Sequence, residues 1–178
     1  MRYLLAALAV GVVAAAPAYA QTGQESAEDL VTQATAICAA VVFDGQTFEA
    51  QLEGRPEWRS VPPSRAGSSL ATHAWQHSAE NDTFVMRLPN GGCSFGVDHG
   101  DSETLRARIE AALAPHATFE VVMQERTRNG RATRYGYCVR EEYPRVMSIV
   151  AGQPDSDPNL VFNLFRAASR MPEFCVFD

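Results

Sequence analysis

Apolar and polar residues alternate along two neighbouring stretches in the middle of the chain, 82–88 and 93–98. A period of two residues is typical of half-buried β-strands. The stretch between them contains Asn90-Gly91, a pair that readily adopts the positive φ angles of a tight turn. The pattern therefore predicts an antiparallel hairpin whose turn lies at residues 89–92.

Similar patterns predict further strands at residues 70–78, 118–124, 134–140 and 145–151. Asn129-Gly130 marks a second hairpin turn. Residues 159–167 could form either a strand or a helix. Val, Phe and Leu favour a strand, whereas Asp157-Pro158 could begin a helix. We interpret this segment as a strand.

Apolar residues recur at helical spacing along two longer segments of the chain. Residues 30–41 present one apolar face after Ser26, a typical N-terminal cap. Residues 102–114 repeat this pattern, and either Asp101 or Ser102 can accept hydrogen bonds from the free amides of the first turn. We predict a helix at each place.

Between the first helix and the strands, the sequence predicts a short helix over 47–52 and then a long loop over 55–69. This loop is rich in Pro, Ser, Arg and Gly and carries Trp58. A loop of this length is either a surface crossing, here anchored by Trp58, or a binding segment in which Trp58 contacts a ligand. Both interpretations stay open.

These elements predict an α+β fold. We expect an antiparallel sheet of about five or six strands, with the N-terminal helix and the mid-chain helix packed on one face. No internal repeat is evident in the sequence.

The first twenty residues have the pattern of a secretory signal peptide. Arg2 precedes an apolar segment, and Ala18-Tyr19-Ala20 is a small-residue cleavage motif. Cleavage after Ala20 would leave residues 21–178, a length that suits a single α+β domain. We therefore predict a periplasmic or secreted protein without a transmembrane anchor in its mature form.

The charge of the chain narrows the choice of partners. The formal net charge is −6, and general binding to nucleic acid needs cations that neutralise phosphates. All 15 basic residues are arginine, which excludes a lysine Schiff base or a lysine general base. We predict no nucleic-acid partner and no cofactor.

Four cysteines in an exported chain predict two disulfides. Loop-closure entropy does not distinguish the pairings, but the predicted faces do. Cys38 and Cys93 fall on core faces, whereas Cys138 lies on the opposite side of its strand from Tyr135 and Tyr137. We predict the pairs Cys38–Cys93 and Cys138–Cys175.

Two motifs near the first hairpin suggest catalysis. The sequence Gly92–Gly96 matches the Gly-x-Ser-x-Gly pattern, with Ser94 as nucleophile, but that pattern requires a sharp turn from a strand into a helix. The residues Asp98, His99 and Asp101 could act as an acid–base group. Turn and capping roles explain the same three residues without catalysis.

Two further patterns suggest binding. Asp155, Asp157 and Asn159 match the first ligands of a calcium loop, although Leu160 and Arg166 replace its glycine and glutamate, so we predict no metal. A group of arginines surrounds the second hairpin turn and could bind an acidic protein or an anionic ligand. It consists of Arg126, Arg128, Arg131 and Arg134.

We therefore predict a small exported bacterial protein that binds a protein or an anionic ligand in the cell envelope and is not an enzyme, such as an inhibitor or accessory protein. The alternative is a small secreted hydrolase that uses Ser94 or the Asp98/His99/Asp101 group. The sequence does not identify the partner or the oligomeric state.

Overall fold

A computed structural model of the chain describes residues 26–78, 83–139, 145–153, 159–166 and 175. Within these residues the helices are α1 (Ala27–Val42), α2 (Phe48–Leu52), the short 3₁₀ helix η1 (Pro63–Ala66) and α3 (Ser102–Leu113). The strands are β1 (Trp58–Val61), β2 (His73–His77), β3 (Phe84–Arg87), β4 (Cys93–Val97), β5 (Glu120–Arg126), β6 (Ala132–Val139), β7 (Arg145–Gly152) and β8 (Leu160–Arg166).

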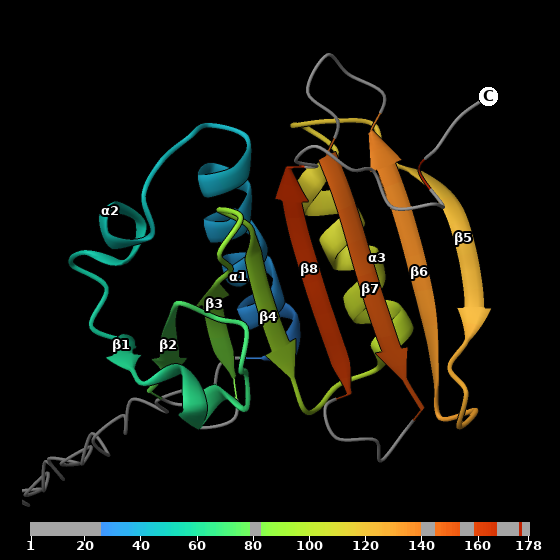
Figure 1. Cartoon of the computed structure of the whole chain (residues 1–178), viewed down its shortest axis with the longest axis horizontal. Helices are drawn as coiled ribbons and strands as arrows, with labels where there is room; N and C mark the ends of the chain where they lie inside the picture. Colours follow the sequence, from blue (N-terminus) through green and yellow to red (C-terminus); the bar gives the residue numbers. More distant parts are fainter. Residues whose placement is uncertain (1–25, 79–82, 140–144, 154–158, 167–174, 176–178) are drawn as a thin grey trace, which may run out of the picture.

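The strands that the structure describes form one antiparallel sheet of eight, in the order β1-β2-β3-β4-β8-β7-β6-β5 (Figure 1). The prediction of five or six strands is therefore wrong, although the α+β description fits. The unpredicted strand β1 lies inside the segment 55–69, whose composition is typical of a loop. This strand is only four residues long and lies at the edge of the sheet, where a strand needs neither strict alternation nor two neighbours.

Both long helices cover the same face of the sheet, and α1 packs against α3 (Figure 1). Ser26 caps the N-terminus of α1, and its Oγ accepts a hydrogen bond from the backbone N–H of Asp29 at 3.2 Å. None of the helices in the described part of the chain is both long and apolar enough to cross a membrane.

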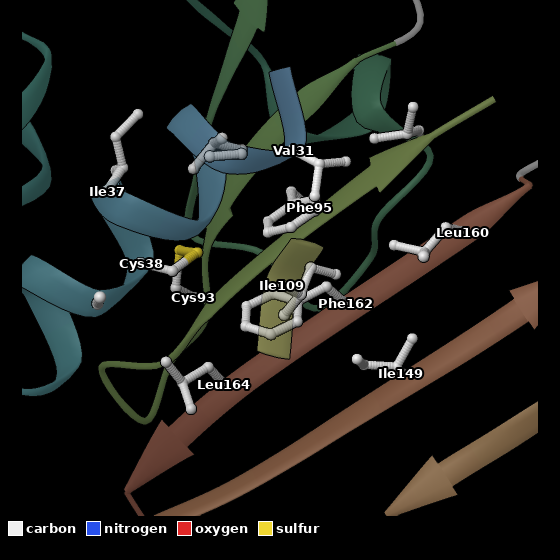
Figure 2. Packing of buried hydrophobic residues seen from close by; sticks show 14 of the residues in the cluster. Val31, Ile37, Cys38, Cys93, Phe95, Ile109, Ile149, Leu160, Phe162 and Leu164 are labelled. Carbon is white, nitrogen blue, oxygen red and sulfur yellow. A yellow bond between two sulfur atoms is a disulfide. The ribbon is translucent and has the colours of Figure 1, made fainter. Parts of the chain in front are cut away.

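The core lies between these helices and the sheet. At its centre the rings of Phe95 on β4 and Phe162 on β8 stack, with centroids 4.6 Å apart. Ile109 from α3 and Val31 from α1 belong to the same buried cluster (Figure 2). The helix-facing residues Val97 and Leu160 of this strand pair are fully buried, whereas Val161 on the other face is half-buried. The helix-facing side of the sheet is therefore the main source of apolar burial.

The sheet is built from two similar halves that the sequence does not reveal. In each half a helix is followed by four consecutive antiparallel strands, and the halves meet where β4 pairs with β8. Because Phe95 pairs with Phe162, a twofold axis through this pair relates the registers of the two halves. The matched rows are Trp75–Val85–Phe95 in the first half and Tyr135–Ile149–Phe162 in the second.

Both predicted disulfides are confirmed. Cys38–Cys93 joins α1 to the start of β4 inside the main core (Figure 2). Cys138–Cys175 lies in a separate buried cluster with Val146. The second cluster is on the other face of the sheet, because Cys138 alternates with Tyr137 along β6.

Candidate anion-binding site

A pocket of about 270 Å³ lies at one end of the sheet, where α1 ends and the β3–β4 hairpin turns. Its described lining consists of Val41, Gly45, Gln46, Thr47, Phe48, Arg87, Asn90, Gly91 and Arg166. The turn forms because Gly91 adopts a φ of 74° and donates its N–H to the carbonyl of Leu88 at 3.1 Å. The pocket therefore includes the hairpin turn that the sequence predicts.

The register of the sheet explains how two arginines reach this pocket. Arg87 is the last residue of β3 and Arg166 is the last residue of β8, and these strands flank β4 on its two sides. Arg87 lies two residues beyond buried Val85, and Arg166 lies two residues beyond buried Leu164. Both arginines are consequently on the helix-facing side of the sheet, next to the end of α1.

The two guanidinium groups have different local partners. Arg166 donates through Nε to the carbonyl of Val42 at 3.0 Å, which fixes the side chain at the end of α1 and leaves its terminal Nη groups for a ligand. Arg87 makes no side-chain hydrogen bond or ion pair with any residue that the structure describes. Its five N–H donors are therefore free to face the pocket.

The neutral polar side chains of the pocket also present donors. Thr47 Oγ1 accepts a hydrogen bond from the backbone N–H of Ala50 at 3.1 Å, so its hydroxyl proton remains available. Asn90 Oδ1 accepts from the backbone N–H of Gly92 at 3.0 Å, which leaves its Nδ2 group. Gln46 Oε1 accepts from Gln51 and likewise leaves its Nε2 group. In each case an acceptor is used within the protein and a donor remains.

The charges of the residues that line the pocket also favour an anionic ligand. No acidic side chain occurs among the described residues that line it. Arg145 on β7 lies directly opposite Arg166 in the sheet, and its guanidinium stacks on the ring of Phe43 at 4.6 Å from the centroid. A further positive charge therefore lies near this end of the sheet.

The second half of the sheet shows that the fold itself does not require an arginine at the position of Arg87. The twofold relation matches Arg87 with Ala151. A small apolar residue therefore satisfies the same backbone position as Arg87. The positive pocket is a property of the first half, added to a framework that both halves share.

A second polar cluster attaches α3 to β6. Arg106 forms ion pairs with Glu103 at 2.8 Å and Glu110 at 2.5 Å, and its guanidinium lies 4.4 Å from the ring centroid of Tyr135. Tyr137 Oη donates to Glu110 at 2.5 Å. Burial, with a further contribution from Glu110, raises the pKa of Tyr137. These groups satisfy one another, so we interpret the cluster as structural.

Ser94 occupies the middle of β4 and is buried. Its hydroxyl donates to the carbonyl of Phe162 on the neighbouring strand at 3.0 Å. A nucleophile elbow would instead place the serine at a turn from a strand into a helix. Four residues of strand span about 13 Å, which also separates Ser94 from Asp98. The geometry gives the hydrolase alternative no support.

The acidic residues and histidine after β4 lie at the start of α3. Asp101 is the N-terminal cap, and its Oδ1 accepts from Thr104 N at 2.8 Å and from Thr104 Oγ1 at 2.7 Å. These hydrogen bonds lower the pKa of Asp101. His99 is exposed and Asp98 is half-buried. The capping role that the sequence allowed for Asp101 is the one observed.

The arginines predicted to bind a partner lie on the β5–β6 hairpin, far along the sheet from the pocket. Arg126, Arg128, Arg131 and Arg134 are all exposed, and Arg134 Nη1 lies 3.3 Å from Glu125 Oε1. A partner for this hairpin remains a prediction.

Trp58 is buried in β1, with its ring edge-on to His77 at a centroid distance of 4.9 Å. This placement corresponds to the anchoring interpretation of the segment 55–69. Among the calcium-loop residues, Asp155 and Asp157 lie outside the described residues. Asn159 donates through Nδ2 to the carbonyl of Gly100.

Sequence reasoning did not find the residues of the pocket. Arg87 and Arg166 are distant in the chain and belong to no motif. The predicted hairpin turn could have pointed to the pocket, because Asn90 and Gly91 of this turn line it.

No protein family, curated protein or solved structure matches this chain.

Proposed function

We propose that this chain is an exported protein that binds a small anionic ligand and does not transform it. The observation that carries this proposal is the uniform hydrogen-bonding character of the pocket. Its two arginines and its three neutral polar side chains all offer donors. An anion rich in acceptor oxygens fits such a lining, and charge-assisted hydrogen bonds are the strong ones.

The chemistry of the lining favours binding over catalysis. Its described residues include no carboxylate, imidazole or thiol that could act as a general base or a nucleophile. Arginine stays protonated at any physiological pH. The pocket is also small, near the lower limit for organic ligands.

Export is the second part of the proposal. It is supported by the signal-like sequence of residues 1–20 and by the two disulfides, which form and persist in oxidising compartments. We expect mass spectrometry of the protein recovered from its native envelope or medium to give a chain that begins at Gln21. Recovery of a chain that begins at Met1 from the cytoplasm would contradict export.

Replacement of Arg87 by glutamine tests the binding proposal. We expect some member of a panel of acetate, succinate and inorganic phosphate to raise the free energy of unfolding of the wild-type protein, by about 2.7 kcal/mol at a concentration of 100 times Kd. Arg87→Gln should weaken binding about tenfold or more, because a charged donor is lost. Melting curves at constant ionic strength would measure both effects.

The matched control is Arg128→Gln, which removes the same charge from the exposed β5–β6 hairpin. It should bind the anion as the wild-type protein does. If Arg128→Gln weakens binding and Arg87→Gln does not, the anion binds the hairpin and the pocket proposal is wrong. If no anion in the panel stabilises the wild-type protein, anion binding itself is wrong.

A further inference from the structure

We propose that the ligand of this pocket is an organic dicarboxylate, with one carboxylate held by Arg87 and the other by Arg166. This inference rests on the proposed anion binding and specifies its ligand. It follows from the separation of the two arginines, the distribution of the neutral donors and the apolar part of the lining.

The two arginines approach the pocket from different sides. Their strands are separated by β4, which places the two backbones about 10 Å apart across the sheet. Cys93 pairs with both Arg87 and Leu164, so Arg166 lies two residues farther along, an offset of about 7 Å. The two guanidinium groups therefore enter the pocket from strands on opposite sides of β4, and a ligand with two separated anionic groups can contact both.

The size of the pocket matches a ligand with two separated anionic groups. A volume of 270 Å³ corresponds to a space roughly 8 Å across if it is treated as a sphere. A single carboxylate or chloride would leave the charge of one of the two guanidinium groups unpaired. Two carboxylates joined by roughly two to four methylene groups would reach both walls of such a space.

The neutral donors are also divided between two walls. Gln46 and Thr47 belong to the connection between α1 and α2, whereas Asn90 belongs to the β3–β4 turn. Each end of a dicarboxylate can thus accept hydrogen bonds from a guanidinium and from a neutral donor. This arrangement is stronger and more selective than a single charged contact.

Two apolar side chains in the pocket favour an organic ligand over an inorganic oxyanion. Val41 and Phe48 line the same pocket. Phe48 is nearly fully buried and stacks on Trp75 with a centroid distance of 5.2 Å, so it forms a fixed wall. Val41 is half-buried and leaves apolar surface beside this wall. A short hydrocarbon segment between two carboxylates would cover that surface, whereas phosphate has no apolar part to do so.

Calorimetric titration of the disulfide-bonded protein with malonate, succinate, glutarate and adipate would test this inference. Acetate, inorganic phosphate and the monoamide of the tightest-binding dicarboxylate complete the panel. We expect one dicarboxylate to bind at least tenfold more tightly than its monoamide, than acetate and than phosphate. The monoamide keeps the length and the apolar segment of the ligand and removes one charge.

Variants of each arginine then locate the two carboxylates. Arg87→Gln and Arg166→Gln should each weaken the dicarboxylate about tenfold or more, whereas the monoamide should respond strongly to only one of them. Arg166→Lys serves as a second variant in case Arg166→Gln impairs folding, because its ammonium can still donate to the Val42 carbonyl. It lacks the planar guanidinium and should also weaken the dicarboxylate, though by less than Arg166→Gln. Arg108→Gln removes the same charge from the exposed surface of α3, where Arg108 pairs with Glu28, and is the control that should leave every affinity unchanged.

Each outcome decides the question. Equal affinity for the dicarboxylate and its monoamide, or tighter binding of phosphate than of every dicarboxylate, would overturn this inference and leave anion binding intact. Absence of binding by every anion would overturn both proposals. A monoamide that loses affinity equally in both arginine variants would show that one carboxylate contacts both guanidinium groups, which also contradicts the inference.

Discussion

Replacing Cys38 and Cys93 together by alanine is expected to lower the free energy of unfolding by about 4 kcal/mol. The disulfide closes a separation of 55 residues, and its loss restores conformational freedom to the unfolded chain. Both sulfurs are also fully buried between α1 and β4, so the folded state loses packing as well. Urea unfolding of the oxidised wild type and the double variant would measure the difference.

The second disulfide provides the matched comparison. Cys138–Cys175 closes 37 residues, so the loop-closure contribution is nearly the same. It lies in the smaller cluster on the other face of the sheet. We therefore expect Cys138→Ala with Cys175→Ala to cost less than the first pair. Nearly equal costs would show that loop closure alone, and not position in the main core, sets the contribution of these disulfides. A clearly larger cost for the second pair would contradict the prediction, because its loop is shorter.

The helices and the cysteine pairing could be predicted because their signals are local. The α1 helix has an apolar face at helical spacing and a Ser26 cap, and both appear in the structure. The cysteine pairs could be predicted from the face of the helix or strand on which each cysteine lies. The sequence indicates this face, because side chains alternate between the two faces along a strand.

The strand count and the internal symmetry could not be predicted for a different reason. The short edge strand β1 pairs only with β2, and its sequence contains no alternation that separates it from a loop. The two halves preserve only the burial of matched positions. Phe95 and Phe162 are identical, but Trp75 corresponds to Tyr135 and Val85 to Ile149, so most of the match is in size and polarity.

The pocket depends on strand order, which is a long-range property. Arg87 and Arg166 come together only because β8 pairs with β4, and no local pattern specifies that pairing. The sequence did point to the right neighbourhood, the hairpin turn at residues 89–92. The residues it suggested there have structural roles, since Ser94 bonds across the sheet and Asp101 caps α3.

The substitution Phe162→Ala is expected to lower the free energy of unfolding by about 3–5 kcal/mol. Phe162 is fully buried and stacks on Phe95 at the point where the two halves of the sheet pair. Removing the ring would leave a cavity in a region supported from both halves and from α3, so collapse around the cavity is difficult. Chemical denaturation followed by circular dichroism would measure the change.

The twofold relation between the halves also predicts the effect of replacing the matched residue Phe95. Phe95→Ala should cost nearly as much as Phe162→Ala, because the two rings occupy matched positions in the same stacked pair. The double variant should cost less than the two single changes combined, since residues in contact do not contribute independently. Val121→Ala on the exposed edge strand β5 is the control and should change stability by no more than about 0.5 kcal/mol. Additive costs for the two phenylalanines, or a large cost at only one of them, would mean that the β4–β8 junction is not a shared core and that the two halves are stabilised separately.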